Sequence, residues 1–102
     1  MTILEKVQIM LDGEDYDVNK IQEYINLVVS RLVIRLGVTE LPLIFYPIAS
    51  EATVKVHRRY LYEGISSEGD SGLTTSFVED VLNEYSSEIE SYSSTVNKVR
   101  FI

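Results

Sequence analysis

His57 is the one histidine of the chain and the first residue to consider for acid–base chemistry. It stands among Lys55, Arg58 and Arg59 on a predicted helix, where positive neighbours disfavour its protonated form. No carboxylate is adjacent to it in the sequence to orient the ring. We therefore expect a partly exposed surface histidine rather than a general base.

Short motifs for nucleophilic or phosphate chemistry are missing from the sequence. Residues 64–69, GISSEG, lack both the G-x-S-x-G spacing and the preceding strand that a nucleophilic serine requires. Neither a G-x-x-x-x-G-K phosphate loop nor a G-x-G-x-x-G dinucleotide turn occurs. The chain has no cysteine, which excludes disulfides, thiolate metal sites and cysteine nucleophiles.

Two groups of carboxylates could be considered for a metal ion. Asp12, Glu14 and Glu23 occupy the first, third and twelfth places of a calcium loop, but Asp17 stands where the sharp turn requires glycine. The second group lies on the last predicted helix and consists of Glu79, Asp80 and Glu84. We expect no catalytic residue, no metal and no cofactor. An enzyme remains only as the case in which the second group binds a metal.

Composition and charge limit the class of protein. The 102 residues, 45% of them hydrophobic, suffice for a single domain with one modest core, residues 1–102. The net charge of -7 is uneven, at -4 over residues 1–23, +3 over 24–59, -8 over 60–97 and +2 over 98–102. Because the acidic C-terminal half repels phosphate, we expect no tight binding of nucleic acid.

The apolar runs and the amino terminus predict a soluble protein. No apolar run approaches the length that a bilayer requires, so we expect no membrane partner. The first residues, MTILEKVQIMLDGED, carry an early glutamate and no long apolar stretch, so they do not predict a secretory signal. An intracellular origin is expected.

Capping residues and apolar spacing predict four helices, and the first two are the most clearly marked. Thr2 and Glu5 have the spacing of a capping box for a helix over residues 3–11. Asp17 is placed to cap a second helix, which Gly37 ends.

The third predicted helix opens at Pro47, where the missing amide hydrogen costs little. It runs to about residue 63. Glu51 and Lys55 stand four residues apart on its charged face, in the order that favours an ion pair.

The fourth predicted helix begins at Ser76, which has the spacing of a capping box with Glu79. Apolar residues recur at three- and four-residue spacings in all four helices and form the predicted core. These residues are Leu4, Val7, Leu11, Ile21, Tyr24, Ile25, Val28, Leu32, Leu36, Ile48, Ala52, Val56, Tyr60, Leu61, Phe77, Val81, Leu82, Tyr85, Ile89 and Tyr92.

A long loop, YEGISSEGDSGLTTSF, separates the last two predicted helices. Three glycines relax its backbone, and its serines and acids offer little apolar surface to hold it down. It is either a tolerated surface excursion or a segment that becomes ordered on a partner or on another copy, and we favour the second.

The tail, residues 93–102, is too apolar for a free terminus. Val99 and Phe101 alternate with Lys98 and Arg100, a pattern that could form a strand. These apolar residues either fold back onto the core of the monomer or dock on another chain. The sequence thus predicts an all-α fold: a small bundle of about four helices in a body over residues 1–92, a long loop before the last helix, and an extended C-terminal tail.

Residues 58–85 carry a resemblance to a known family. The run Arg58-Arg59-Tyr60, the segment EGISSE from Glu63 to Glu68, the acidic stretch to Gly72, and TSF before the last helix resemble the head–tail connector, or adaptor, family of tailed bacteriophages. In length and helix order the likeness covers nearly the whole chain. It implies a small α-helical virion protein that forms a ring under the portal and joins the DNA-filled head to the tail or to a head-closure protein.

The resemblance also implies the partners. They are other copies of the chain in a ring, dodecameric in the virion, the portal protein, and a head-closure or tail-completion protein. Double-stranded DNA would pass through the ring without specific binding. The protein would lie at the head–tail interface of the virion, and in the host cytoplasm during assembly. The residues that we expect at its interfaces are Arg58, Arg59, Glu63, Glu68, Asp70, Val99, Arg100, Phe101 and Ile102.

The charge pattern offers a way for copies to meet. A basic middle and acidic ends provide complementary flanks for a head-to-tail contact within a ring. An acidic surface that faces the channel of the ring would not bind the DNA that passes through it. The alternative is a small acidic helical interaction or regulatory module, without ring assembly, in which the loop is only a linker.

Overall fold

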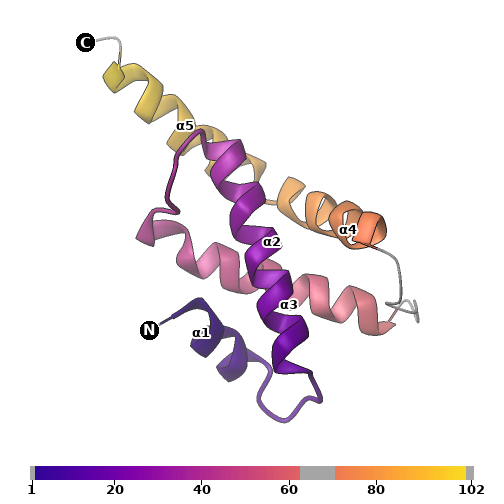
Figure 1. The fold of residues 1–102 in the computed structure, drawn as a ribbon. Coiled ribbons are helices and arrows are strands. Elements are labelled where there is room, and N and C mark those ends of the chain that lie inside the picture. The colour runs from indigo at the N-terminus through magenta and orange to yellow at the C-terminus, as the bar shows by residue number, and fades with distance from the viewer. Residues whose placement is uncertain (1, 63–70, 101–102) are drawn as a thin grey trace.

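All the regular secondary structure in the part of the chain that the structure describes is helical. The computed structural model describes residues 2–62 and 71–100, with the side chains of residues 2–61 and 75–94 (Figure 1). Its helices are α1 (Ile3–Met10), α2 (Val18–Leu36), the short 3₁₀ helix η1 (Leu43–Phe45), α3 (Tyr46–Tyr62), α4 (Ser71–Asn83) and α5 (Ser86–Arg100). Within residues 2–62 and 71–100 the all-α class is confirmed, with five α-helices where about four were predicted.

The predicted starts of α1 and α2 are confirmed in detail. The amide of Glu5 donates to Oγ1 of Thr2 over 3.1 Å, and the amide of Thr2 donates to Oε1 of Glu5 over 2.8 Å, so the capping box is complete. Oδ1 of Asp17 accepts from the amide of Asn19 at the start of α2. Gly37 ends α2 with φ +70°, a conformation that favours glycine.

The central element of the bundle is α3. It contacts α1, α2 and α4, while α2 also packs against α4 and α5 (Figure 1). Since neighbours cover α3 on several sides, its buried positions extend well around the helix, including Ala49, Thr53 and Val56. The hydroxyl of Thr53 donates back to the carbonyl of Ala49 over 2.8 Å, so its burial leaves no hydroxyl unpaired.

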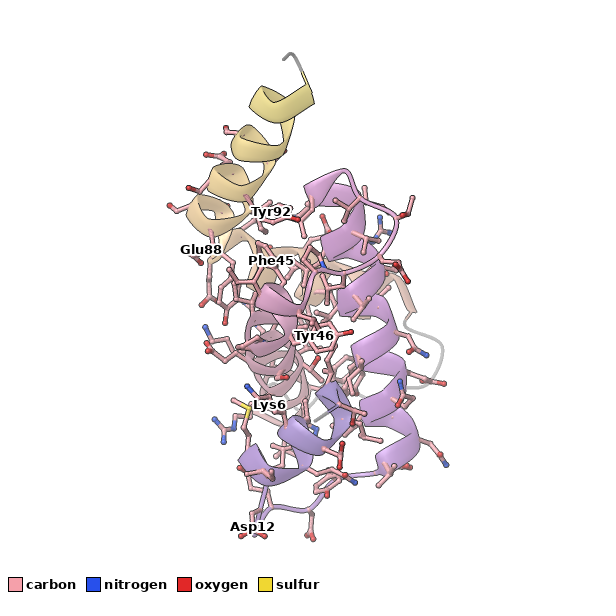
Figure 2. The ribbon with its side chains drawn as sticks, turned by 90° about the vertical axis from the view of Figure 1, so that its left-hand side faces the viewer. Lys6, Asp12, Phe45, Tyr46, Glu88 and Tyr92 are labelled. Atoms are coloured by element: carbon pink, nitrogen blue, oxygen red, sulfur yellow. The ribbon has the colours of Figure 1, made fainter. Side chains whose placement is uncertain are left out.

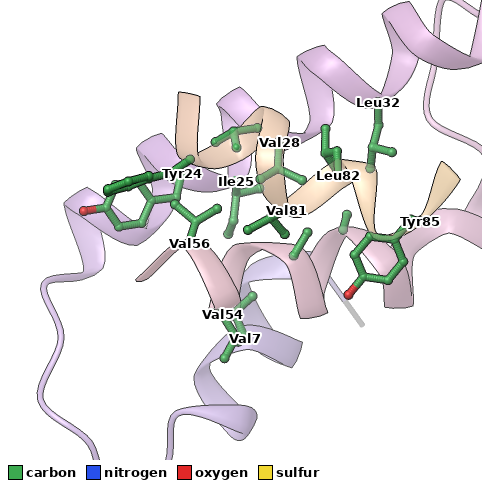
Figure 3. Close-up of a cluster of buried hydrophobic side chains, with 14 of the residues drawn as sticks. Val7, Tyr24, Ile25, Val28, Leu32, Val54, Val56, Val81, Leu82 and Tyr85 are labelled. Atoms are coloured by element: carbon green, nitrogen blue, oxygen red, sulfur yellow. The ribbon is translucent and has the colours of Figure 1, made fainter. Parts of the chain in front are cut away.

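The core follows the predicted apolar stripes. All six predicted core residues of α2 are buried, and Figure 3 shows several of them facing residues of α3 and α4. The rings of Tyr24 and Tyr60 stack with centroids 5.6 Å apart, and Phe77 meets Tyr60 edge to face at 5.4 Å. One assignment was wrong: Leu61 is 55% exposed, because it lies beside the buried stripe rather than on it.

The predicted start of the fourth helix was wrong. The helix begins at Ser71, so Ser76 lies inside α4 with its side chain exposed, and Glu79 is not part of a cap. A capping-box pattern marks a possible start, but an exposed serine within a helix costs only about 0.5 kcal/mol relative to alanine. The final part of the predicted loop is therefore helical, while residues 63–70 lie outside the described part of the chain.

The predicted last helix is divided into α4 and α5. Amides of Glu84 and Tyr85 donate to the carbonyls three residues before them, and the hydroxyl of Ser86 donates to the carbonyl of Asn83 over 2.7 Å. These tighter bonds satisfy the end of α4 and turn the chain into α5. The apolar spacing from Val81 to Ile89 continues across the break, which is why periodicity did not reveal it.

The predicted extended tail was also wrong for residues 93–100. They form the last turns of α5, which ends at Arg100. A strand needs a neighbouring strand for its backbone hydrogen bonds, and none occurs in residues 2–62 and 71–100. A helix satisfies these bonds within itself, and the spacing of three between Val96 and Val99 suits a helix as well.

Candidate interaction surfaces

The charged side of α4 is held against α2 by two arginines. Nη2 of Arg35 lies 2.9 Å from Oε2 of Glu79 and also donates to the carbonyl of Glu79. Nη1 of Arg35 donates to Asn83 over 3.1 Å. Nε of Arg31 lies 3.8 Å from the other oxygen of Glu79, within ion-pair range but beyond a hydrogen bond. Thus α2 and α4 are joined by charge as well as by the core.

On its other side, α4 is paired with α3. Arg59 lies 3.6 Å from Asp80, and its guanidinium stands 5.4 Å from the centre of the Phe77 ring. Nζ of Lys55 donates to Glu84 over 2.8 Å, and this hydrogen bond, more than any other contact, raises the pKa of Lys55. The predicted partner of Lys55 on its own helix was Glu51, but Lys55 pairs instead with Glu84, in the turn that follows α4.

Glu51 has a different role from the predicted ion pair. The phenol of Tyr85 donates to it over 3.2 Å. Nζ of Lys55 stands 4.9 Å from the centre of the Tyr85 ring. The result is a small polar cluster that joins α3 to the junction of α4 and α5.

The turn between α1 and α2 is tied to α3 in the same way. Nη2 of Arg58 donates to Oε2 of Glu14 over 2.8 Å, and this bond lowers the pKa of Glu14. The basic residues of segment 24–59 therefore all have acidic partners within the chain; they are Arg31, Arg35, Lys55, Arg58 and Arg59. The basic residues that we expected to attract an acidic flank of another copy therefore form ion pairs within one copy.

The predicted interface residues fall into three groups. Arg58 and Arg59 both lie on α3 but pair with different elements, Arg58 with the turn after α1 and Arg59 with α4. Val99 and Arg100 lie in the last turn of α5. The remaining predicted residues, Glu63, Glu68, Asp70, Phe101 and Ile102, lie outside the described part of the chain.

His57 is buried rather than partly exposed, so that prediction was wrong. The residue is only 9% exposed, because α1 and the following turn cover the side of α3 that carries it. Burial is the main cause that lowers its pKa, and the neighbouring Arg58 acts in the same direction while Glu14 opposes it. Its Nε2 has no hydrogen-bond partner among the described residues. A buried, unoriented imidazole is poorly suited to acid–base catalysis.

The carboxylates considered for a metal are engaged in ion pairs. Glu79, Asp80 and Glu84 meet different basic residues on α2 and α3, as does Glu14 of the candidate calcium loop. Within the described residues, no group of three or more histidine, aspartate or glutamate side chains is placed to hold a metal ion. The same part of the chain contains no helix that is both long and apolar enough to span a membrane.

The connection between α2 and α3 exposes apolar side chains that the sequence reading did not single out. Leu43 and Ile44 of η1 are 76% and 72% exposed, and Ile34 on the last turn of α2 is 67% exposed. Only Phe45 of η1 is buried. The sequence did carry a signal for this surface, the run LPLIF. It holds five apolar residues, and a connection of this length can bury only one or two of them.

A groove lies beside this connection. Its volume is about 670 Å³, within the range of ~300–1,000 Å³ that is common for binding pockets. The start of α1, the outer side of α2 and the connection line it, and we call it the α2–α3 groove. Its lining residues are Ile3, Asn26, Val29, Ser30, Val33, Thr39, Glu40, Leu41, Leu43 and Tyr46.

The last helix projects from the bundle. The ring of Tyr92 packs edge to face on Phe45 with centroids 5.3 Å apart, and Ile89 is buried (Figure 2). Beyond them, Figures 1 and 2 show the end of α5 extending past the ends of α2 and α3. Glu88, labelled in Figure 2, is exposed on the outer side of this helix, and Glu90 is exposed as well.

Comparison with known proteins adds no relative. No protein-family model matches the chain, and neither the curated proteins nor the solved structures contain a match.

Proposed function

We propose that this chain is a non-catalytic structural protein, a head–tail connector of a tailed bacteriophage, that forms a ring under the portal and joins the head to the tail or head-closure protein. The observation that carries the proposal is the exposed apolar surface around the α2–α3 groove, on a domain whose other side is closed by ion pairs. Exposed apolar side chains that gather beside a groove are typical of a surface that another protein covers.

The resemblance of residues 58–85 to the connector family supplies the identity of the assembly. The all-helical fold and the size of the domain are compatible with such a ring subunit. The exposed acids Glu88 and Glu90 on α5, together with Glu84, offer a surface that would not hold DNA passing through the ring.

Assembly of the purified chain is the test. Mass photometry and negative-stain electron microscopy, at rising protein concentration and with the portal protein of the same phage genome, should reveal rings. Replacing both Leu43 and Ile44 by serine should weaken assembly by roughly tenfold or more, because each buried side chain of this kind is worth about 1.5–3 kcal/mol.

Leu61→Ser is the matched control. It also removes an exposed apolar side chain, but at the far end of α3, and should leave assembly unchanged. A chain that remains a monomer at every concentration, with and without portal, would refute the connector proposal.

One observation favours a second candidate, a small acidic interaction or regulatory module without a ring. Since the basic residues of segment 24–59 pair within the chain, they give little attraction to an acidic flank of another copy. Such a module would bind one partner through the groove and stay monomeric or dimeric in the same experiments.

A further inference from the structure

The α2–α3 groove combines an apolar wall with a single carboxylate. Val29, Val33, Leu41 and Leu43 contribute apolar side chains, and the exposed Glu40 is the only aspartate, glutamate, lysine or arginine among the lining residues. An occupant that fits this surface carries apolar side chains and positive charge, with no acid to meet Glu40.

The C-terminal segment 95–102, TVNKVRFI, has this chemistry. It contains four apolar residues, two bases and no acid, in a chain whose net charge is -7. Residues 28–35, VVSRLVIR, have a similar composition, but they form part of α2, and Arg31 and Arg35 pair with Glu79. From these two observations we infer that segment 95–102 of one copy docks in the α2–α3 groove of a second copy.

The direction of α5 makes the contact intermolecular. Arg100 lies 11 residues after Ile89, the last buried residue of α5 that the structure describes, which places it about 16 Å farther along the helix axis. Phe101 and Ile102 add at most ~7 Å of reach. Because α5 points away from the bundle in both Figures 1 and 2, its end cannot return to the groove of its own copy while the helix is intact.

Such a contact joins two different surfaces of the chain. A contact between unlike surfaces repeats from copy to copy and closes into a ring when the rotation between copies allows it. The inference deepens the proposed function and rests on it, since it names the contact through which neighbouring subunits of the ring would be held together.

The absence of cysteine permits a direct test by disulfide trapping in the full chain. One preparation carries a cysteine appended after Ile102, which leaves the segment intact. The other carries Thr39→Cys, an exposed position in the groove that leaves its apolar side chains in place. After mixing and mild oxidation, a non-reducing gel should show the mixed disulfide, at least about fivefold above the control, because docking raises the local concentration of the two thiols.

The control is Asn19→Cys, also an exposed polar position on the surface but at the opposite end of α2. Circular dichroism checks that each variant is folded. A further arm exchanges charges: Glu40→Lys in the groove copy should lower the cross-linking yield roughly two- to fivefold, and Lys98→Glu in the tail copy should restore it.

The outcomes separate the inference from the proposed function. Equal yields at Thr39 and Asn19, or none, would overturn the inference, even if the wild-type chain forms rings with portal. Selective trapping at Thr39 in a chain that never forms rings would support the contact between copies and refute the connector.

Discussion

The two long sides of the bundle differ in how far their side chains are satisfied. On the α4 side, three carboxylates meet basic residues of α2 and α3, above a core that is closed to solvent. On the side of the α2–α3 connection, Leu43 and Ile44 are more than two thirds exposed beside an open groove. The difference teaches that the charged side chains of one side are paired within the chain, whereas the apolar surface of the other side is available for association.

The largest expected contrast is in the free energy of unfolding when one leucine on each side is truncated. Leu82→Ala on α4 removes a side chain that is fully buried and should lower the free energy of unfolding by about 2–5 kcal/mol, because a cavity remains. Leu43→Ala removes an exposed side chain and should change it by less than about 0.5 kcal/mol. Urea denaturation followed by circular dichroism measures both.

One result would contradict this predicted contrast between Leu82→Ala and Leu43→Ala. A loss at Leu43 as large as the loss at Leu82 would mean that η1 contributes to the core, and the two sides would no longer differ. When assembly is measured on the same samples, Leu43→Ala should weaken assembly more than it lowers the free energy of unfolding.

The first two helices were predictable because each carries its own signals. The capping box of Thr2, the cap at Asp17 and the stripe of α2 are local patterns, and the structure confirms all three. The break at Glu84 and Tyr85 was not predictable, since neither residue disfavours a helix strongly and the apolar spacing continues through it.

The surfaces were less predictable than the helices. Ion pairs such as Arg35 with Glu79 join residues 44 positions apart, and only the packing of α2 on α4 brings them together. The burial of His57 likewise depends on α1 covering α3, which no pattern within α3 reveals. The exposed residues of η1 had a signal in the apolar run LPLIF, but deciding which of its residues face solvent required the fold.

The charged side can be weakened without opening the core. Glu79→Gln keeps the shape of the side chain but removes the charge that Arg31 and Arg35 share, and it should lower the free energy of unfolding by about 1 kcal/mol or less, since the carboxylate is 40% exposed. The loss should shrink in about 1 M salt, where exposed charges are screened. Thermal and urea unfolding at two salt concentrations measure it.

Glu88→Gln is the matched control for this prediction. Glu88 is exposed on α5 and makes no ion pair with the side chains that the structure describes, so its neutralisation should be nearly silent at either salt concentration. If both variants behave alike, the pairing of Glu79 contributes no stability and the charged side is held by packing alone.

The smallest expected effect is a pH dependence that belongs to His57. Burial lowers the pKa of His57 in the folded chain below its ordinary value of 6.5, so the unfolded chain binds the proton more readily. Stability from this residue is therefore complete above about pH 6.5 and is lost as the pH falls toward the folded pKa. Urea unfolding from about pH 7.5 to about pH 5 should show a decline that His57→Gln removes.

Carboxylates should act in a separate window. A hydrogen bond from Arg58 lowers the pKa of Glu14 below 4.5, so the stability that Glu14 contributes is present above that value and lost below it. Glu14→Gln should therefore leave the decline between about pH 6.5 and pH 5 in place, whereas His57→Gln abolishes it. Were the decline to persist in His57→Gln, another group would cause it, and the buried imidazole would not contribute to the pH dependence of stability.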